Sequence, residues 1–171
     1  MELSDTRQRV MEMLDAHHIP YEYHEHERAP TIEDCLKMPF IDNDVTICKN
    51  ILLCNRQQTR YFLLLLKPLT PFRTAVVSKA LGVSRLSFAP EEALEELLHL
   101  TSGSVSPLGL LFDPEHTITL CYEKAIKATR RIAFHPCDNS ATLVFEQSIF
   151  WDQVIPSLQI QPISIALNEN N

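Results

Sequence analysis

The chain has 171 residues, of which 45% are hydrophobic and 22% charged, and this composition excludes a collagen-like, low-complexity or disordered chain. Its 15 Lys and Arg residues against 22 Asp and Glu give a formal net charge of −7, which argues against a wholly basic nucleic-acid clamp. The chain has only 3 glycines, where an average usage of about 7% predicts roughly 12.

The ends and the cysteines favour a cytoplasmic protein. The N-terminus is charged and lacks the apolar stretch of a signal peptide, and the longest apolar run, residues 61–66, is far shorter than the roughly 20 residues that span a bilayer. Five cysteines without a CxxC pair are typical of reduced thiols. His24 and His26 share a strand face, but no further spacing completes a zinc set. We therefore expect no membrane association, no metal and no cofactor.

Charge is divided between two consecutive segments. Residues 45–90 hold seven Lys and Arg and no acid, whereas residues 91–123 hold seven Asp and Glu and no base. Both segments can be solvated faces of a mixed surface. The alternative is a basic surface for a polyanion, with Arg73, Lys79 and Arg85 as candidate contacts, beside an acidic surface with another role.

The predicted elements alternate irregularly along the chain. The first elements are a helix that Ser4 or Asp5 can cap and that ends before Pro20, an extended segment at 21–26, and a short helix that a capping box at residues 31–34 opens. A β-hairpin of 45–54 and 61–66 follows, and after it come a helix at 74–81 that Gly82 can end and a helix at 90–99. The rest of the chain is a non-helical stretch at 101–109, strands at 117–121, 131–134 and 142–145, a helix at 147–154 and a strand at 160–166. No linker or repeat divides them. This order predicts an α+β fold with a mixed sheet, as a single compact domain over residues 1–167 followed by a frayed tail at 168–171.

Lys49 is the first candidate for chemistry. On an extended strand, it shares one face with Val45, Ile47, Ile51 and Leu53. An ammonium within an apolar stripe is costly without a partner, a ligand or a lowered pKa. The alternative is a half-covered face from which the lysine reaches water.

Two further places are candidates. Gly103 and Gly109 lie within seven residues of each other, which suggests a loop whose backbone a Cβ would disturb and whose N–H groups can face an oxyanion or a phosphate. A plain turn after a helix would use the glycines equally well. His135 and Asn139 follow the strand at 131–134 and can line a pocket, although a structural histidine beside an asparagine turn is the commoner arrangement.

Together, these places resemble the YbaK/ProX family of aminoacyl-tRNA deacylases, which is related to the editing domain of bacterial prolyl-tRNA synthetase. The resemblance rests on residues 48–53 (CKNILL), 103–107 (GSVSP) and 134–142 (FHPCDNSAT), with residues 31–34 (TIED) as a fourth segment. It spans roughly residues 20–155 in the right order, and the last stretch is most similar to the free-standing branch that clears alanine from tRNA(Pro).

The resemblance implies a fold, a reaction and roles for individual residues. The fold is a compact domain around a mixed, partly barrel-like sheet with surrounding helices, and the reaction is hydrolysis of the ester that joins a wrong amino acid to the tRNA 3′ end. Lys49 and Gly103 would be the catalytic residues. The division of charge, and not the resemblance, makes Arg73, Lys79 and Arg85 the candidate contacts for the tRNA. Prolyl-tRNA synthetase is a second candidate partner. The residues that would bind substrate are Ser104, Val105, Ser106, Pro107, His135 and Asn139.

Two other functions stay open, and one residue has no assigned role. A deacylase for Cys-tRNA(Pro) or another small amino acid differs only in the side chain that it accepts. A non-catalytic module that binds tRNA or a synthetase would keep the fold, but it would not need Lys49, the glycine loop and His135 together. Glu123 stands where many relatives have an aspartate after a strand, so whether it replaces that residue is open.

Overall fold

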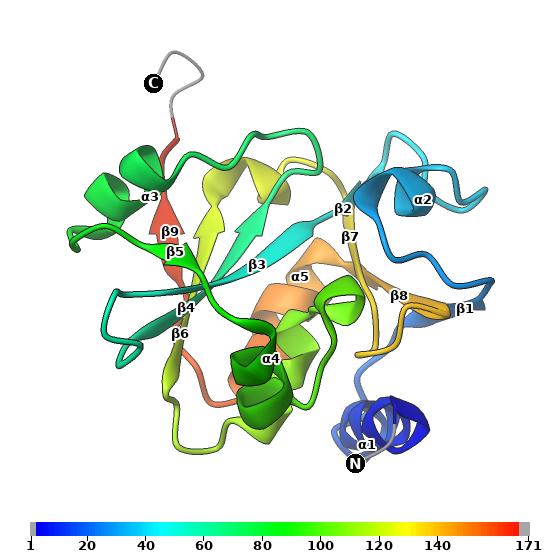
Figure 1. Ribbon diagram of the computed structural model, residues 1–171. Coiled ribbons are helices and arrows are strands. Elements are labelled where there is room, and N and C mark those ends of the chain that lie inside the picture. The colour runs from blue at the N-terminus through cyan, green and yellow to red at the C-terminus, as the bar shows by residue number, and fades with distance from the viewer. Residues whose placement is uncertain (1–2, 168–171) are drawn as a thin grey trace.

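The structure, a computed structural model, describes residues 3–167 and arranges their strands in two mixed sheets (Figure 1). The four-stranded sheet has the order β1 (Glu22–Glu25), β8 (Ala141–Glu146), β7 (Arg131–Phe134) and β2 (Val45–Ile47), of which only the β2–β7 pair is parallel. The five-stranded sheet has the order β5 (Ser87–Phe88), β3 (Lys49–Cys54), β4 (Tyr61–Leu66), β6 (Ile118–Glu123) and β9 (Ile163–Ile165). In it, β5, β3 and β4 pair antiparallel, while β4–β6 and β6–β9 are parallel.

Helices pack against the two sheets. They are α1 (Leu3–Ala16), α2 (Ile32–Leu36), α3 (Thr74–Leu81), α4 (Glu91–Leu98), and a last helix formed by α5 (Gln147–Ile149), a π-helical turn (Phe150–Val154) and α6 (Ile155–Ser157). Short 3₁₀ turns are η1 (Ser102–Ser104), η2 (Pro107–Phe112) and η3 (Lys124–Lys127). None of the helices within residues 3–167 is long and apolar enough to cross a membrane.

Local signals in the sequence explain two of the helix ends. Thr31 forms the predicted capping box at the start of α2, because its side chain accepts from the Asp34 N–H while the Asp34 carboxylate accepts from the Thr31 N–H. At the end of α3, Gly82 adopts a φ of 68°, a left-handed conformation that glycine tolerates without strain. Both ends therefore depend on a few neighbouring residues.

The largest core lies between the two sheets. Because side chains alternate along a strand, Leu63 and Leu65 of β4 face this core together with Phe134 of β7, whereas Leu64 belongs to a second cluster that Val77 of α3 covers. A third cluster lies between α2 and the outer face of the four-stranded sheet. Burial on both faces explains why β4 is an uninterrupted apolar run.

The α+β class with mixed sheets is confirmed, but the sheet is divided in two, and within residues 3–167 neither sheet closes into a barrel. The predicted hairpin begins only at Lys49, because β2 pairs with β7 and the chain then crosses at Cys48 into the other sheet. The stretch 101–109 contains 3₁₀ turns, and Ser4 and Asp5 lie within α1 rather than at its cap. The two-residue strand β5 was not predicted, and the expected tail at 168–171 lies outside the described residues.

Candidate functional site

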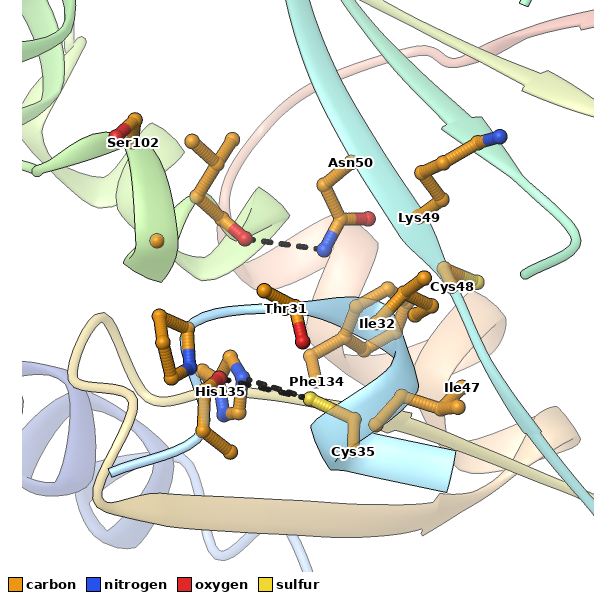
Figure 2. A pocket seen from close by; sticks show the side chains of 14 residues that line it. Thr31, Ile32, Cys35, Ile47, Cys48, Lys49, Asn50, Ser102, Phe134 and His135 are labelled. Carbon is orange, nitrogen blue, oxygen red and sulfur yellow. Dashed lines mark hydrogen bonds between the residues drawn. The ribbon is translucent and has the colours of Figure 1, made fainter. Parts of the chain in front are cut away.

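A cavity of about 200 Å³ opens where the chain crosses between the two sheets. The segments that meet there are far apart in the sequence: the start of α2, the crossing from β2 to β3, the loop before η2, and the end of β7 (Figure 2). Its lining includes Pro30, Thr31, Ile32, Cys35, Ile47, Cys48, Lys49, Asn50, Ser102, Gly103, Val105, Phe134 and His135. The cavity thus brings together Lys49, Gly103, Val105 and His135, four of the predicted site residues.

Lys49 and Asn50 leave β3 in opposite directions, as neighbouring residues of a strand do (Figure 2). The Lys49 Nζ donates to the carbonyl oxygen of Thr70 and points away from Asn50. Burial lowers the pKa of Lys49, and the charge of Glu123 acts in the opposite direction. Lys49 therefore lies at the rim of the cavity, while its ammonium is directed to the loop between β4 and α3.

Asn50 joins the strand to the glycine loop. Its Nδ2 donates to the carbonyl oxygen of Val105 at 3.0 Å, and its Oδ1 is buried without a hydrogen-bond partner among the described residues. A buried acceptor without a partner is costly unless something else supplies a donor. The Asn50 amide is therefore a candidate to receive a donor group of a bound molecule.

Gly103 is packed closely between two other segments of the site. A Cβ added there would lie 3.2 Å from the Asn139 Nδ2 and 3.2 Å from the Pro30 Cβ. Asn139 also accepts a hydrogen bond from the Ala29 N–H through its backbone carbonyl, at 2.9 Å. This close approach, rather than a positive φ, is what requires glycine at position 103. Asn139 supports the loop and the segment before α2 but does not line the cavity.

His135 is held in one orientation and forms a pair with Cys35. Its Nδ1 lies 2.7 Å from the carbonyl oxygen of Ala141, which can only accept, so we assign the ring proton to Nδ1. The Nε2 is then an acceptor and lies 3.4 Å from the Cys35 Sγ. Burial lowers the pKa of His135 and raises the pKa of Cys35 to about 11. The pair is therefore a neutral thiol and a neutral imidazole at pH 7, which suits a pocket wall better than a nucleophile and its base.

Glu123 is buried and anchors the loop that Lys49 contacts. One carboxylate oxygen accepts from the Lys67 N–H at 3.0 Å, and the other accepts from the Thr70 hydroxyl at 3.1 Å. Because the Lys49 ammonium binds the carbonyl of the same threonine, Glu123 acts on Lys49 through the loop as well as through its charge. This contact gives Glu123 a structural role beside the candidate lysine.

The remaining predicted residues lie outside the cavity lining. Ser104, Ser106 and Pro107 are buried, and the Ser106 Oγ accepts from the Leu108 N–H at 3.2 Å. These residues therefore stabilise the loop without lining the cavity. The three candidate polyanion contacts are exposed and gather around α3: Arg73 precedes it, Lys79 lies in it and Arg85 follows it.

Sequence reasoning missed Cys35 and Asn50 as cavity residues. Cys35 lies four positions after Thr31, so both face the same side of α2, and this spacing is the signal that could have identified it. Asn50 follows Lys49 directly, but its role becomes evident only from its contact with Val105, 55 positions later in the chain.

Comparison with known proteins shows the class to which this site belongs. The profile of the aminoacyl-tRNA editing domain matches residues 26–149, a range that contains all four segments of the cavity. The chain therefore belongs to the aminoacyl-tRNA editing domain family, and this membership makes it an aminoacyl-tRNA deacylase, as the motifs predicted.

Two relatives and one solved structure illustrate the match. The chain is 34% identical over 140 residues to the prolyl-tRNA editing protein ProX of Acetoanaerobium sticklandii, covering 82% of this chain and 85% of that protein. It is 30% identical to the prolyl-tRNA synthetase associated domain-containing protein 1 of Danio rerio, covering 81% and 76%. A crystal structure described as a candidate trans-editing enzyme for prolyl-tRNA synthetase superimposes with a TM-score of 0.71 at 14% identity, covering 95% and 98%. This last match supports the fold.

Proposed function

We propose that the chain hydrolyses mischarged tRNA in trans and that its preferred substrate is Ala-tRNA(Pro). The size of the cavity carries this proposal. A volume of about 200 Å³ lies below the range of about 300–1,000 Å³ that is usual for pockets holding drug-sized ligands, so it suits a small amino-acid side chain. Ile32, Cys35, Ile47 and Phe134 form an apolar wall, which does not favour a charged amino-acid side chain.

The reaction requires little from the protein beyond positioning. An aminoacyl ester is already activated, so the site has to place water, stabilise the tetrahedral oxyanion and exclude larger amino acids. We assign the oxyanion to the backbone of the loop at Gly103, and the α-ammonium of the amino acid to the unpartnered Oδ1 of Asn50. His135 and Cys35 form the wall that rejects proline by its size.

Lys49 does not act as a general base in this proposal. Its Nζ donates to the Thr70 carbonyl and points away from the cavity, so it is not placed to take a proton from a water molecule at the ester. We assign Lys49 to the negative charge of the terminal nucleotide, because the loop at Gly103 takes the developing oxyanion and the Lys49 ammonium points away from that loop. Arg73, Lys79 and Arg85 would contact the body of the tRNA from the exposed surface around α3.

Prolyl-tRNA synthetase is the proposed protein partner, and the acidic helix α4 is its candidate contact. Glu92 and Glu96 are both exposed on α4 and lie four positions apart, on one side of the helix. Reversing both charges should weaken association with the synthetase, measured by analytical ultracentrifugation. Unchanged association would remove α4 from the interface.

A deacylation panel tests the proposal. Purified protein should hydrolyse Ala-tRNA(Pro) faster than Cys-tRNA(Pro), Ser-tRNA(Pro) and correctly charged Pro-tRNA(Pro) under identical conditions, and Lys49→Ala should reduce the rate to that of buffer alone. Faster hydrolysis of Cys-tRNA(Pro) would assign the chain to the cysteine-specific alternative. Binding of all four tRNAs without hydrolysis would favour the non-catalytic binding module.

A further inference from the structure

A second, larger cavity lies on the other side of Lys49. Its volume is about 500 Å³, and it is formed by the loop between β4 and α3, by α3 itself, by the end of β6 with the turn after it, and by Leu167 after β9. The residues that matter below are Lys67, Thr70, Arg73, Val76, Glu123 and Ala125, all of which line it. Arg73 is the only predicted site residue among its lining, so the motifs did not point to this cavity.

Lys49 connects the two cavities. Lys49 is part of the lining of the first cavity, and its ammonium donates to the carbonyl oxygen of Thr70, which lines the second. In Figure 2 the lysine side chain points away from the first cavity and its labelled neighbours. A molecule that reached from one cavity to the other would therefore pass Lys49.

The two volumes suit the two ends of an aminoacyl nucleotide. The first cavity, at about 200 Å³, is too small for an amino acid together with its nucleoside, whereas the second, at about 500 Å³, lies within the range of about 300–1,000 Å³ that small-molecule sites occupy. An aminoacyl-tRNA needs a site for each part, because its ester bond joins the amino acid to the terminal nucleoside.

The charges of the second cavity favour an anion. Lys67 and Arg73 are exposed cations at its lining, in a segment, residues 45–90, that contains no Asp or Glu. The carboxylate that lines the cavity, Glu123, is buried, and each of its oxygens accepts a hydrogen bond from the loop at residues 67–70. Val76, Ala125 and neighbouring apolar residues form a wall on which the face of a base can pack.

We propose that this second cavity binds the 3′-terminal nucleotide of the tRNA. The base lies against the apolar wall, the phosphate faces Lys67 and Arg73, and the ester extends past Lys49 so that the amino acid enters the first cavity. This assignment rests on the proposed function, because it places the remainder of the same substrate.

A matched pair of alanines tests the assignment: Ala125 lies in η3, and Ala128 follows its last residue. Ala125 and Ala128 are both exposed, but only Ala125 lines the cavity. Ala125→Phe should fill the nucleotide site and raise the half-saturating enzyme concentration for single-turnover deacylation of Ala-tRNA(Pro) at least about tenfold, equivalent to about 1.4 kcal/mol of binding. Ala128→Phe should stay within about twofold of wild type on the same scale. Equal behaviour of the two variants would overturn the assignment.

A binding experiment separates this assignment from the proposed function. Titration with adenosine 5′-monophosphate, followed by backbone amide NMR signals, should shift residues 67–73 and 124–127 in the wild type, and these shifts should vanish in Ala125→Phe. An absence of shifts in those segments would refute the nucleotide site even if the protein deacylates Ala-tRNA(Pro). Conversely, shifts in a protein that hydrolyses none of the charged tRNAs would support the site and refute the proposed activity.

Discussion

Gly103→Ala tests whether the glycine loop touches the reaction. The added Cβ would lie 3.2 Å from the Asn139 Nδ2 and 3.2 and 3.3 Å from the Cβ and Cα of Pro30, whereas ordinary carbon contacts lie at about 3.5–4.0 Å. The Pro30 atoms belong to the backbone and to a ring, so the loop must move by a few tenths of an ångström. Overpacking of this kind costs about 1–3 kcal/mol of the free energy of unfolding.

The same displacement should reduce the rate. A misplacement of about 1 Å costs about 10² in rate, and complete loss of an oxyanion donor costs about 10²–10³. We therefore expect the single-turnover rate constant of Gly103→Ala on Ala-tRNA(Pro) to fall by about tenfold or more at saturating enzyme. The assay is release of radiolabelled alanine, with urea unfolding measured on the same preparation.

Gly109→Ala is the matched control. Its Cβ would lie 3.0 Å from the Leu100 Cδ1 and 3.6 Å from the Cys137 Sγ, in the core rather than at the cavity. We expect this variant to lose a similar amount of stability while its folded fraction deacylates at the wild-type rate. If Gly103→Ala also kept the wild-type rate despite its lower stability, the loop would not be at the ester and the assignment of the oxyanion would be wrong.

Three further variants examine the cavity walls. Lys49→Ala should reduce turnover to the rate in buffer alone. Its urea midpoint should change little, because the Lys49 side chain is only half-buried. Wild-type turnover would remove Lys49 from the site. Cys35→Ala should widen the pocket beside His135 and raise hydrolysis of Pro-tRNA(Pro) relative to Ala-tRNA(Pro) about tenfold. The reason is that a difference of one methylene between two substrates changes discrimination by about 1–3 kcal/mol in a closely fitting pocket. Unchanged discrimination in competition assays would show that Cys35 does not limit the size of the pocket. Burial holds the pKa of His135 below the unfolded value of about 6.5, so the folded protein binds fewer protons and loses this stability as pH falls below about 6.5. His135→Gln should therefore flatten the pH dependence of urea unfolding between about pH 5 and 7, and an unchanged slope would contradict this account.

The sequence alone was sufficient for the features that short segments determine. The capping box at Thr31 and the left-handed end at Gly82 depend on hydrogen bonds and backbone preferences within about four residues. The strand at 131–134 was predicted with the bounds that β7 has, because its apolar residues form a continuous run. The family was also identified from the sequence, because its motifs are short segments in a fixed order.

The tertiary structure alone decided how those segments meet. The strand expected over residues 45–54 divides at Cys48, because β2 finds its partner in β7, more than 80 positions later in the chain. That division creates the first cavity and sets the direction of the Lys49 ammonium toward Thr70. Such pairings depend on which distant surfaces pack together, and local propensity does not encode that choice.

The scarce glycines and the basic segment at residues 45–90 are explained only by the sequence and the tertiary structure together. The sequence determined that glycine is scarce and that two of the three lie close together, but the reason for Gly103 is the approach of Pro30 and Asn139 from elsewhere in the chain. The sequence likewise determined that residues 45–90 are basic, while only the fold shows that Lys67 and Arg73 from that segment line one cavity. Composition is a property of the chain, but a site is a property of distances between residues, and those distances exist only after the two sheets have packed.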